Sequence, residues 1–457
     1  MPTYHYRCVD CNCEDQRIAG LDDHTALCSG CGGLMLRLDE NSLNRISTNP
    51  NRRKTMKCSI SQPDFAKAIS AVLGVVDKRG TMPILSNVLL KANGDGGIHV
   101  SATDLEVSYK GFCPASIEAP GAITVPAHQL ASLVKDMPLG DLQVETTENH
   151  NLKIFQGEAK YRLHGLDPEQ FPPIPDAEEG VGYLEIPSST LKEMIKRVIF
   201  SVSMDDLQYH LSSVLWENIE GQALRLVSTD GHRLTLTEHS FPLAGLLLGE
   251  GGILVPRKGM TELLRFMEGC ETVSLAVQNQ ALIAKAGNKT LTIRLLDMRF
   301  PEYRRIIPPW FTVKWTFNRE EMFRTLKRLA LVNTEKFKGV VFTPQGDHVT
   351  LQSENPDIGD GLEIVSWTEE KAEPPAPAKE AGKEEGGEEE ETPPQEPEAE
   401  QPPDLSAFGF NIRFLLDPLA AMTAETVEME GNFSNRPFRI RAVGDPSFFS
   451  VVMPMGL

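Results

Sequence analysis

Residues 228–234 read Ser-Thr-Asp-Gly-His-Arg-Leu, which places four reactive side-chain types within five positions. Such a cluster could serve hydrolysis, which requires a nucleophile, a base within hydrogen-bonding distance and an oxyanion site. The chain contains no Gly-x-Ser-x-Gly, P-loop or His-Glu-x-x-His motif that would supply the rest of such a site. One histidine beside an aspartate and an arginine does not predict an enzyme, so we expect a non-catalytic role.

Two Cys-x-x-Cys pairs near the N-terminus form a second chemical pattern, and sixteen residues separate them. Four thiolates at this spacing suit a tetrahedral zinc ion. A unit this short has too small an apolar core to fold without a cross-link such as a bound metal ion. Redox-active or unliganded thiols are the alternative. The candidate zinc ligands are Cys8, Cys11, Cys28 and Cys31, and Cys13, His5 and His24 are further candidates.

The 457-residue chain carries a net charge of −19, which at first argues against a nucleic-acid partner. Residues 369–404 alone contribute −11, because they hold fourteen acidic residues and three lysines. The overall charge therefore says little about any local surface. No apolar run is long enough to span a membrane, and the N-terminus lacks the apolar stretch of a signal peptide. We expect a cytoplasmic protein without a membrane partner.

The chain divides into a small cysteine-rich unit, a linker and a long repeated region. Residues 1–40 hold five of the eight cysteines, and residues 41–55 are polar and without pattern. Met56 begins what reads as a fresh domain, so the residues before it are either a real fusion or added upstream sequence. Residues 369–404 combine the acidic run with eight prolines and no aromatic residue, which predicts a disordered insertion in the last domain.

Three units of similar order follow Met56. Each begins with an apolar-periodic helix candidate, at 65–76, 191–202 and 322–332, and continues with a hairpin-like pair of strands. A second helix candidate follows in each unit. Val-Pro opens the first two of these, with Val expected in a strand and Pro in the first turn of the helix. Three units of one α+β architecture should stack or ring and share sheets edge to edge. The predicted domains are residues 56–182, 183–311 and 312–457, named here domains 1, 2 and 3.

The stretch at 228–234 is the second copy of a repeated strand segment. Asp104 in Ala-Thr-Asp and Asp230 in Ser-Thr-Asp occupy matching places, and the third unit has Glu-Asn-Pro-Asp about as far downstream. We therefore interpret the shared Thr-Asp as structural. Gly231-His232-Arg233 differs from the first copy, and we interpret it as an insertion that would carry any special role.

Residues 56–457 resemble the bacterial β sliding clamp family. The stretches that carry the resemblance span all three units: TMPILSNVLL, ATDLE, TDGHRL, VPRKG, RFPEYRRIIP, EKFKGV and VVMPM. The N-terminal MPTYHYRCVDC and SGCGG resemble the small zinc-ribbon proteins called FmdB-type regulators. The clamp resemblance implies three copies of one α+β domain and two chains joined head to tail as a ring around duplex DNA. It also implies a non-catalytic processivity role that tethers the replicative polymerase, with the clamp loader and other enzymes of DNA as further partners.

A ring around DNA should line its hole with positive charge, because B-DNA carries one charge about every 1.7 Å of its axis. The six helix candidates together carry +7, in a region whose total is negative. An ordinary solvated helix face is the alternative for each helix taken singly. Contacts in the hole would reach phosphates only, without sequence preference. The resemblance assigns DNA contact to Arg79, Lys135, Lys196, Arg197, Arg257, Lys258 and Arg265, and His128 and Gln129 stand where the family often has basic residues.

The resemblance also places the Thr-Asp-Gly-His-Arg-Leu strand in a slot on the ring face that accepts a short partner peptide. Leucine, isoleucine, valine, proline and methionine would make its walls apolar, and histidine and arginine would supply directional donors at the rim. Gly456 stands where the family commonly has arginine, which softens one edge. The implied slot residues are Leu211, Thr229, Gly231, His232, Arg233, Leu234, Pro301, Arg305, Ile306, Val451, Met453, Pro454 and Met455.

A subunit seam completes the ring that the resemblance implies. The chemistries on its two sides are complementary, which favours a working ring. The competing hypothesis is a zinc-ribbon transcription regulator built on a clamp scaffold, and ring integrity distinguishes the two. The implied seam joins Lys160, Tyr161 and Arg162 of domain 1 to Leu331, Val332, Asp357, Asp360 and Glu363 of domain 3.

Overall fold

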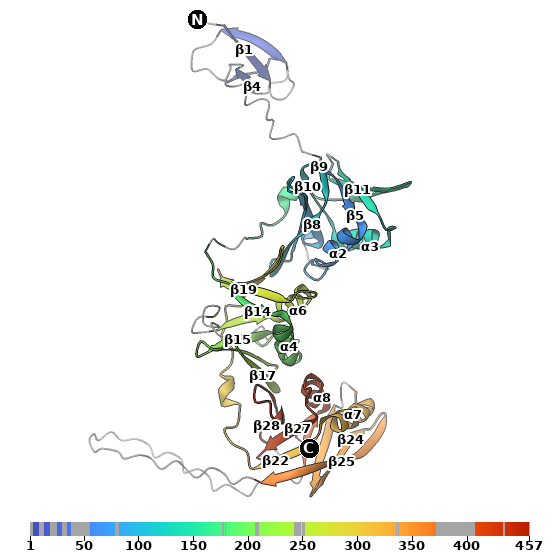
Figure 1. Cartoon of the computed structure of the whole chain (residues 1–457), viewed down its shortest axis with the longest axis vertical. Coiled ribbons are helices and arrows are strands. Elements are labelled where there is room, and N and C mark those ends of the chain that lie inside the picture. The colour runs from blue at the N-terminus through green and yellow to red at the C-terminus, as the bar shows by residue number, and fades with distance from the viewer. Residues whose placement is uncertain are drawn as a thin grey trace, which may run out of the picture.

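The computed structural model (Figure 1) describes residues 3–8, 13–18, 25–29, 34–37, 55–77, 82–147, 149–175, 178, 180–205, 210–241, 248, 252–334, 336, 338–371, 407–432 and 435–456. Of the predicted features, Arg79, Cys11, His24, Cys31, residues 41–54 and residues 372–404 lie outside these ranges. In the part that is described, no helix is both long enough and apolar enough to cross a membrane.

Four short strands precede domain 1 and form one antiparallel sheet in the order β2-β1-β4-β3. Tyr6 of β1 is buried. The strands are β1 (Thr3–Cys8), β2 (Glu14–Ile18), β3 (Thr25–Leu27) and β4 (Leu34–Arg37).

Domain 1 packs two helices against two antiparallel sheets. One sheet runs β10-β6-β7-β8 and the other β13-β12-β11-β5-β9. Alternating residues of the central strands are buried, as in Lys57–Ser61 and Val107–Pro114, because one face of each sheet covers the core. The elements are β5 (Lys57–Ser61), α2 (Gln62–Ser70), β6 (Asn87–Ala92), β7 (Gly97–Thr103), β8 (Val107–Pro114), β9 (Ser116–Ala119), β10 (Gly121–Pro126), α3 (Ala127–Asp136), β11 (Asp141–Thr146), β12 (Asn151–Gln156) and β13 (Ala159–His164).

Domain 2 repeats this arrangement, with sheets β18-β15-β16-β17 and β21-β20-β19-β14. Its helices bury one apolar stripe each, which in α4 is made by Leu191, Met194, Ile195 and Val198. The elements are β14 (Leu184–Pro187), α4 (Ser188–Val198), β15 (Ser213–Ile219), β16 (Ala223–Thr229), β17 (Arg233–Ser240), β18 (Ile253–Pro256), α6 (Arg257–Phe266), β19 (Thr272–Gln278), β20 (Ala281–Ala286) and β21 (Lys289–Arg294).

Domain 3 contains the sheets β29-β28-β27-β22 and β25-β24-β23-β26, and β22 joins them by pairing with the end of β25. A stack of aromatic rings fills its core, with Trp315 4.9 Å from Trp367 and 5.4 Å from Phe408 between ring centroids. The elements are β22 (Val313–Asn318), α7 (Arg319–Leu329), β23 (Gly339–Gln345), β24 (His348–Asn355), β25 (Gly359–Lys371), β26 (Phe408–Asn411), α8 (Ile412–Ala421), β27 (Thr426–Gly431), β28 (Phe438–Ala442) and β29 (Phe448–Val452).

The acidic insertion begins later than predicted. Glu369, Glu370 and Lys371 belong to β25 and pair with Val313–Trp315 of β22. The indole Nε1 of Trp315 donates a hydrogen bond to Glu369 Oε2 at 3.1 Å. The predicted start at residue 369 is therefore wrong, because strand pairing holds these charged residues in the sheet.

Each of the six predicted helices is present in the described part of the chain, but their bounds differ from the prediction. The first helix of each domain, α2, α4 or α7, begins three residues before the predicted start and ends earlier than predicted. Short 3-10 turns, Ile199–Ser201 and Ala330–Val332, take up the residues after α4 and α7. Pro126 and Pro256 close β10 and β18 and stand at the cap position before α3 and α6, not in the first helical turn as predicted.

The prediction that sheets are shared edge to edge is confirmed at both domain junctions within the chain. Strand β8 of domain 1 pairs with β21 of domain 2, and β17 of domain 2 pairs with β29 of domain 3, both antiparallel. Strands β8 and β17 are each the third strand of the sheet that contains the predicted hairpin of their domain. Each pairs with the last strand of the next domain, β21 or β29. The helices of successive domains lie on the same side of these sheets (Figure 1).

Candidate functional site at the junction of domains 2 and 3

The turn at residues 229–233 is held by its own side chains. Asp230 Oδ1 accepts hydrogen bonds from the backbone N–H groups of His232 and Arg233, each at 3.1 Å. The Thr229 hydroxyl donates to the carbonyl of Arg233 at 2.6 Å and accepts from the N–H of Gly231 at 3.1 Å. Threonine and aspartate therefore act here as a turn scaffold.

Domain 1 contains the same turn. Asp104 Oδ1 accepts from the N–H groups two and three residues on, at 3.0 and 2.7 Å, and the Thr103 hydroxyl accepts from the N–H of Leu105 at 3.0 Å. Leu105 and Gly231 share a positive φ, 77° and 87°. Thr103 pairs with Ser108 and Thr229 with Leu234, so the two turns between the paired strands have the same length. The interpretation of residues 231–233 as an insertion is therefore wrong. They replace residues of the first copy one for one, and glycine relieves the strain of the positive φ.

Arg233 does not stand at the rim of a slot as predicted. Its side chain is 8% exposed, and its guanidinium donates to Asp230 at 3.0 Å, to Asp417 at 2.6 Å and to the Phe200 carbonyl at 2.5 Å. The same group lies 4.6 Å from the ring centroid of Phe414. Asp417 and Phe414 belong to α8 of domain 3. Arg233 therefore links domains 2 and 3, and its hydrogen-bonding capacity is directed inward.

His232 remains at the surface of this junction. Its ring stacks on Phe414, with 6.2 Å between centroids and 17° between planes. Its carbonyl accepts a hydrogen bond from the Met453 N–H at 3.0 Å. Phe414 and Asp417 were not among the predicted residues, because no local motif marks them and they lie far along the chain from the turn.

The predicted slot is partly assembled by strand pairing. Leu234 of β17 lies opposite Val451 of β29, and both belong with Tyr303 to one buried apolar cluster. Ile306, Met453 and Met455 keep a third or more of their surface exposed. The other members differ: Leu211 and Thr229 are buried, Pro301 and Pro454 are half-buried, and Gly231 and Arg305 are exposed, with Arg305 Nε 2.7 Å from Glu302.

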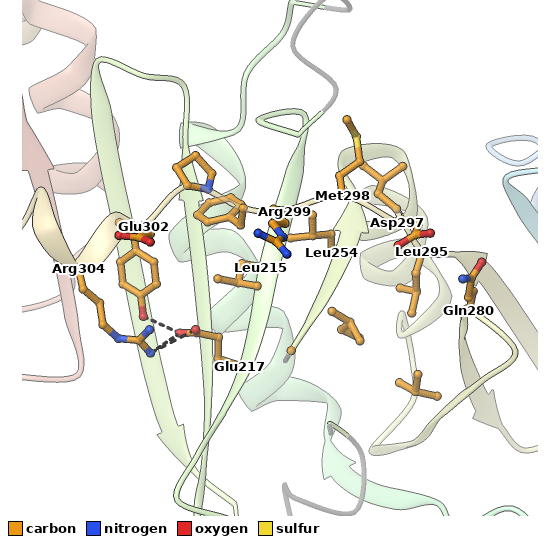
Figure 2. Close-up of a pocket in the computed structure, with 17 residues that line it drawn as sticks. Leu215, Glu217, Leu254, Gln280, Leu295, Asp297, Met298, Arg299, Glu302 and Arg304 are labelled. Atoms are coloured by element: carbon orange, nitrogen blue, oxygen red, sulfur yellow. Dashed lines mark hydrogen bonds and ion pairs between the residues drawn. The ribbon is translucent and has the colours of Figure 1, made fainter. Parts of the chain in front are cut away.

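A cavity of about 570 Å³ lies beside the slot in domain 2. Figure 2 shows it between β15, β18, the β19–β20 turn and the connector 295–304. Of the predicted slot residues, Pro301 lines it. No local sequence motif indicates this cavity, because its wall is gathered from separate strands. Its lining includes Leu215, Glu217, Leu254, Leu295, Arg299 and Tyr303.

One wall of this cavity is a polar network. The Tyr303 hydroxyl donates to Glu217 Oε2 at 2.5 Å and accepts from Arg225 Nη1 at 3.1 Å. Arg225 also donates to Glu238, at 2.7 and 2.9 Å. Burial and the bond to Glu217 raise the pKa of the Tyr303 hydroxyl, so it stays a neutral donor at physiological pH. The network fixes the connector against β15.

The predicted DNA-contacting cations fall into two groups. Lys135 and Lys196 are exposed, and no ion pair involves them within the described ranges. The others are engaged: Arg197 pairs with Glu193 and Asp445, Lys258 with Asp104 across the domain 1–2 junction, Arg265 with Glu262, and Arg257 contacts Met204. His128 is half-buried and Gln129 exposed. Counting charges along the helices could not reveal Asp104 and Asp445, which lie outside them.

The two sides of the predicted seam carry opposite charges, basic on domain 1 and acidic on domain 3, and each side also has an exposed apolar or aromatic side chain. Lys160, Tyr161 and Arg162 are exposed on β13, and Leu331, Asp357 and Asp360 are exposed in domain 3. Val332 is half-buried. Glu363 instead pairs with Arg328 of its own domain, at 2.8 Å, and hydrogen bonding from Arg328 lowers the pKa of the Glu363 carboxyl.

The cysteine cluster is described in part. Cys28 is buried, and its Sγ lies 3.1 Å from the Sγ of Cys13. The backbone of Cys8 ends β1. Among the described residues no group of three or more metal-binding side chains is assembled.

Comparison with known families matches all three domains. The profiles of the DNA polymerase III β subunit fit residues 56–175 with its N-terminal domain, 185–302 with its central domain and 380–456 with its C-terminal domain. The "Beta sliding clamp" of Pseudomonas putida is 31% identical over 406 residues, which is 88% of this chain and 100% of that protein. That of Escherichia coli K12 is 29% identical over 404 residues, with the same coverage.

Solved structures agree with these matches. The Caulobacter crescentus β sliding clamp, crystallised with PEG bound to a putative β-motif tethering region, has a TM-score of 0.77 at 29% identity and covers 89% of this chain and 100% of its own. The Pseudomonas aeruginosa clamp bound to griselimycin has a TM-score of 0.74 at 28% identity, over 88% of this chain and 100% of its own.

Proposed function

The chain belongs to the DNA polymerase III β subunit family and is a DNA sliding clamp without catalysis of its own, and from this we propose that two copies close head to tail into a ring around duplex DNA. The observation that carries the proposal is the repeated junction. Strands β8 and β17 each pair with the last strand of the next domain. The strand in the third domain that corresponds to them is β25, and its equivalent partner is β13 of another copy.

Within the described part of the single chain, both edges are open. Strand β13 ends its sheet, and residues 359–366 of β25 pair only with β24 among the described residues. Large apolar side chains stand beside these edges: Leu331 is 77% exposed, Ile364 59% and Tyr161 47%. Open edges and exposed apolar groups of this size favour association. A heterologous contact that closes after two copies forms a ring.

Lysines support the placing of DNA in the hole. Lys135 and Lys196 stand exposed on α3 and α4, on the helix side of the sheets. Arg197 and Lys258 pair with acidic groups across domain junctions, and Arg265 pairs within α6, so few of the predicted cations are unpaired among the described residues and we expect weak, salt-sensitive equilibrium binding. We infer that retention is topological, and that the clamp works in the cytoplasm with the replicative polymerase, the clamp loader and other proteins that dock in the slot.

Retention on closed DNA tests the ring. A clamp placed on nicked circular duplex by its clamp loader should stay bound through gel filtration in high salt, because the ring cannot leave a closed circle. Cutting the circle should release it. Equal retention before and after cutting would contradict the ring. The uncut circle in the same buffer is the control for salt.

We propose further that the N-terminal unit holds one structural zinc ion through Cys8, Cys11, Cys28 and Cys31. The buried Cys28 suits a ligand, and the nearby Cys13 is a candidate to replace one of the four. Zinc bound by thiolates would cross-link a unit too small to fold on its core alone. The unit's own role is open to protein or nucleic-acid contact.

Metal content tests this site. Purified full-length protein should carry about one zinc per chain. Cys28→Ser should lose it, while Cys270→Ser, at a half-buried cysteine of domain 2, should keep it. Comparing the zinc content of Cys13→Ser with that of Cys11→Ser decides which of these two thiols is the fourth zinc ligand. Protein that is metal-free as isolated, with reactive thiols at these positions, would refute zinc. The melting temperature of domains 1–3 should not change in any variant.

A further inference from the structure

The cavity beside the slot has the make-up of a ligand site. Its floor is apolar, since Leu215, Leu254 and Leu295 are each less than a tenth exposed. Its volume of about 570 Å³ is in the range of pockets that hold small ligands or side chains. Its acidic groups at one end are already bonded, because Glu217 accepts from Tyr303 and Arg304 and Glu302 pairs with Arg305.

Arg299 gives the cavity an available positive charge. Figure 2 shows its guanidinium above Leu215 and Leu254, with Asp297 away from it at the end of the cavity near Gln280. The side chain of Arg299 is exposed, and no ion pair involves it in the part of the chain that is described. An arginine above an apolar floor suits a ligand that carries an apolar group and a carboxylate together.

The fold itself does not require this arginine. Domain 1 has the corresponding corner, where Leu166 bridges to Thr124 as Leu296 bridges to Leu254. Three residues beyond Leu166 stands Glu169, at the place that Arg299 takes after Leu296. The two corners share this bridge but differ beyond it, because Glu169 lies in a 3-10 turn at Pro168–Gln170, whereas in domain 2 the turn comes later, at Tyr303–Arg305. The bridge therefore forms without an arginine at this position, and domain 2, which contributes Leu234 and Pro301 to the slot, has one there.

We propose that this cavity binds an apolar side chain and a neighbouring carboxylate from the segment of the partner protein that flanks the residues in the slot. The proposal rests on the proposed function of the slot. The connector 299–306 is the wall between the two: Pro301 borders both, and the buried Tyr303 packs in one cluster with Leu234 and Val451 of the slot. A peptide that leaves the slot over Pro301 reaches Arg299 directly.

N-acetyl-L-phenylalanine is the probe for this cavity, and its primary amide is the neutral match. Both should shift the methyl NMR signals of Leu215 and Leu254 in the full-length protein, and leave Leu130 of domain 1 unchanged. The acid should bind about tenfold more tightly than the amide, as expected for one charge-assisted contact. Arg299→Gln should remove that difference, and Arg294→Gln, at an exposed arginine of β21 outside the cavity, should keep it. Absence of saturable shifts, or equal affinity of acid and amide for the unaltered protein, overturns the proposal.

Binding of the replicative polymerase's catalytic subunit from the same organism separates the cavity from the slot. Arg299→Glu should weaken it about tenfold, Arg299→Lys less, and removal of residues 453–457 should weaken it more. Normal binding by Arg299→Glu, together with loss in the truncated chain, overturns the cavity and keeps the slot. Normal polymerase binding by the truncated chain would instead refute the slot. The methyl NMR shifts caused by N-acetyl-L-phenylalanine then decide whether the cavity binds a ligand independently of the slot.

Discussion

Replacing Arg233 with methionine is expected to destabilise the junction of domains 2 and 3 by about 3 kcal/mol, the scale for removing one partner from a buried ion pair. The change keeps much of the apolar volume but leaves the carboxylates of Asp230 and Asp417 without their shared cation. It also leaves the Phe200 carbonyl without a donor. Urea unfolding followed by fluorescence and circular dichroism should show a lower midpoint for these two domains.

Arg305→Met is the matched control, because that side chain is largely exposed and its partner is a surface glutamate. Surface pairs contribute little to stability, so its unfolding curve should follow the unaltered protein. If the Arg233 and Arg305 variants unfold alike, the buried guanidinium does not hold the junction. In either case, the affinity of the variants for a slot peptide should be compared at equal fractions of folded protein. Arg233 is buried at the junction, so its replacement is expected to change peptide binding only by unfolding the junction.

Replacing Ile364 with aspartate is expected to convert the proposed dimer into single chains at micromolar concentration. Ile364 is 59% exposed on the open edge of β25, so the single chain tolerates a charge there. In each of the two seams the same charge would be buried without a partner, at a cost of roughly 3 kcal/mol per seam, which for the ring is on the order of ten-thousandfold in dissociation constant. Analytical ultracentrifugation measures the change directly.

Thr368→Asp is the control for this seam. Thr368 is exposed on the same strand, but it lies in the stretch that already pairs with β22. It should leave the dimer intact and retention on circular DNA unchanged. A dimer of normal strength in the Ile364→Asp protein would place the contact between copies on another surface.

The repeated architecture could be predicted from the sequence because the spacing of apolar residues and the order of helix and hairpin candidates repeat along the chain. Three helix candidates, three hairpins and the matching Thr-Asp pairs sufficed for the domains and their shared sheets. The bounds of the helices could not be predicted, because capping turns such as Ala330–Val332 continue the apolar pattern beyond the last helical residue. The start of the insertion was misplaced for a related reason: composition marks Glu369 as acidic but does not report its strand partner.

The roles of single charged residues were the least predictable. Arg233 and Asp417 are separated by 184 positions, and only the fold shows that they meet. Lys258 was counted as a DNA contact, yet it pairs with Asp104. The resemblance to a family supplied the slot but not the cavity, since Leu254 lies in none of the matching stretches and the RFPEYRRIIP stretch, which begins at Arg299, was assigned only to the slot.

Two of the three kinds of domain junction in the proposed ring lie within one polypeptide, at β8–β21 and β17–β29. Dilution cannot separate partners on the same chain, because their effective concentration is fixed by the fold. It acts only on the seams. A cell that produces few copies would therefore hold well-folded arcs before it held closed rings, and the supply of protein, rather than the stability of its domains, would set how many clamps are ready for use.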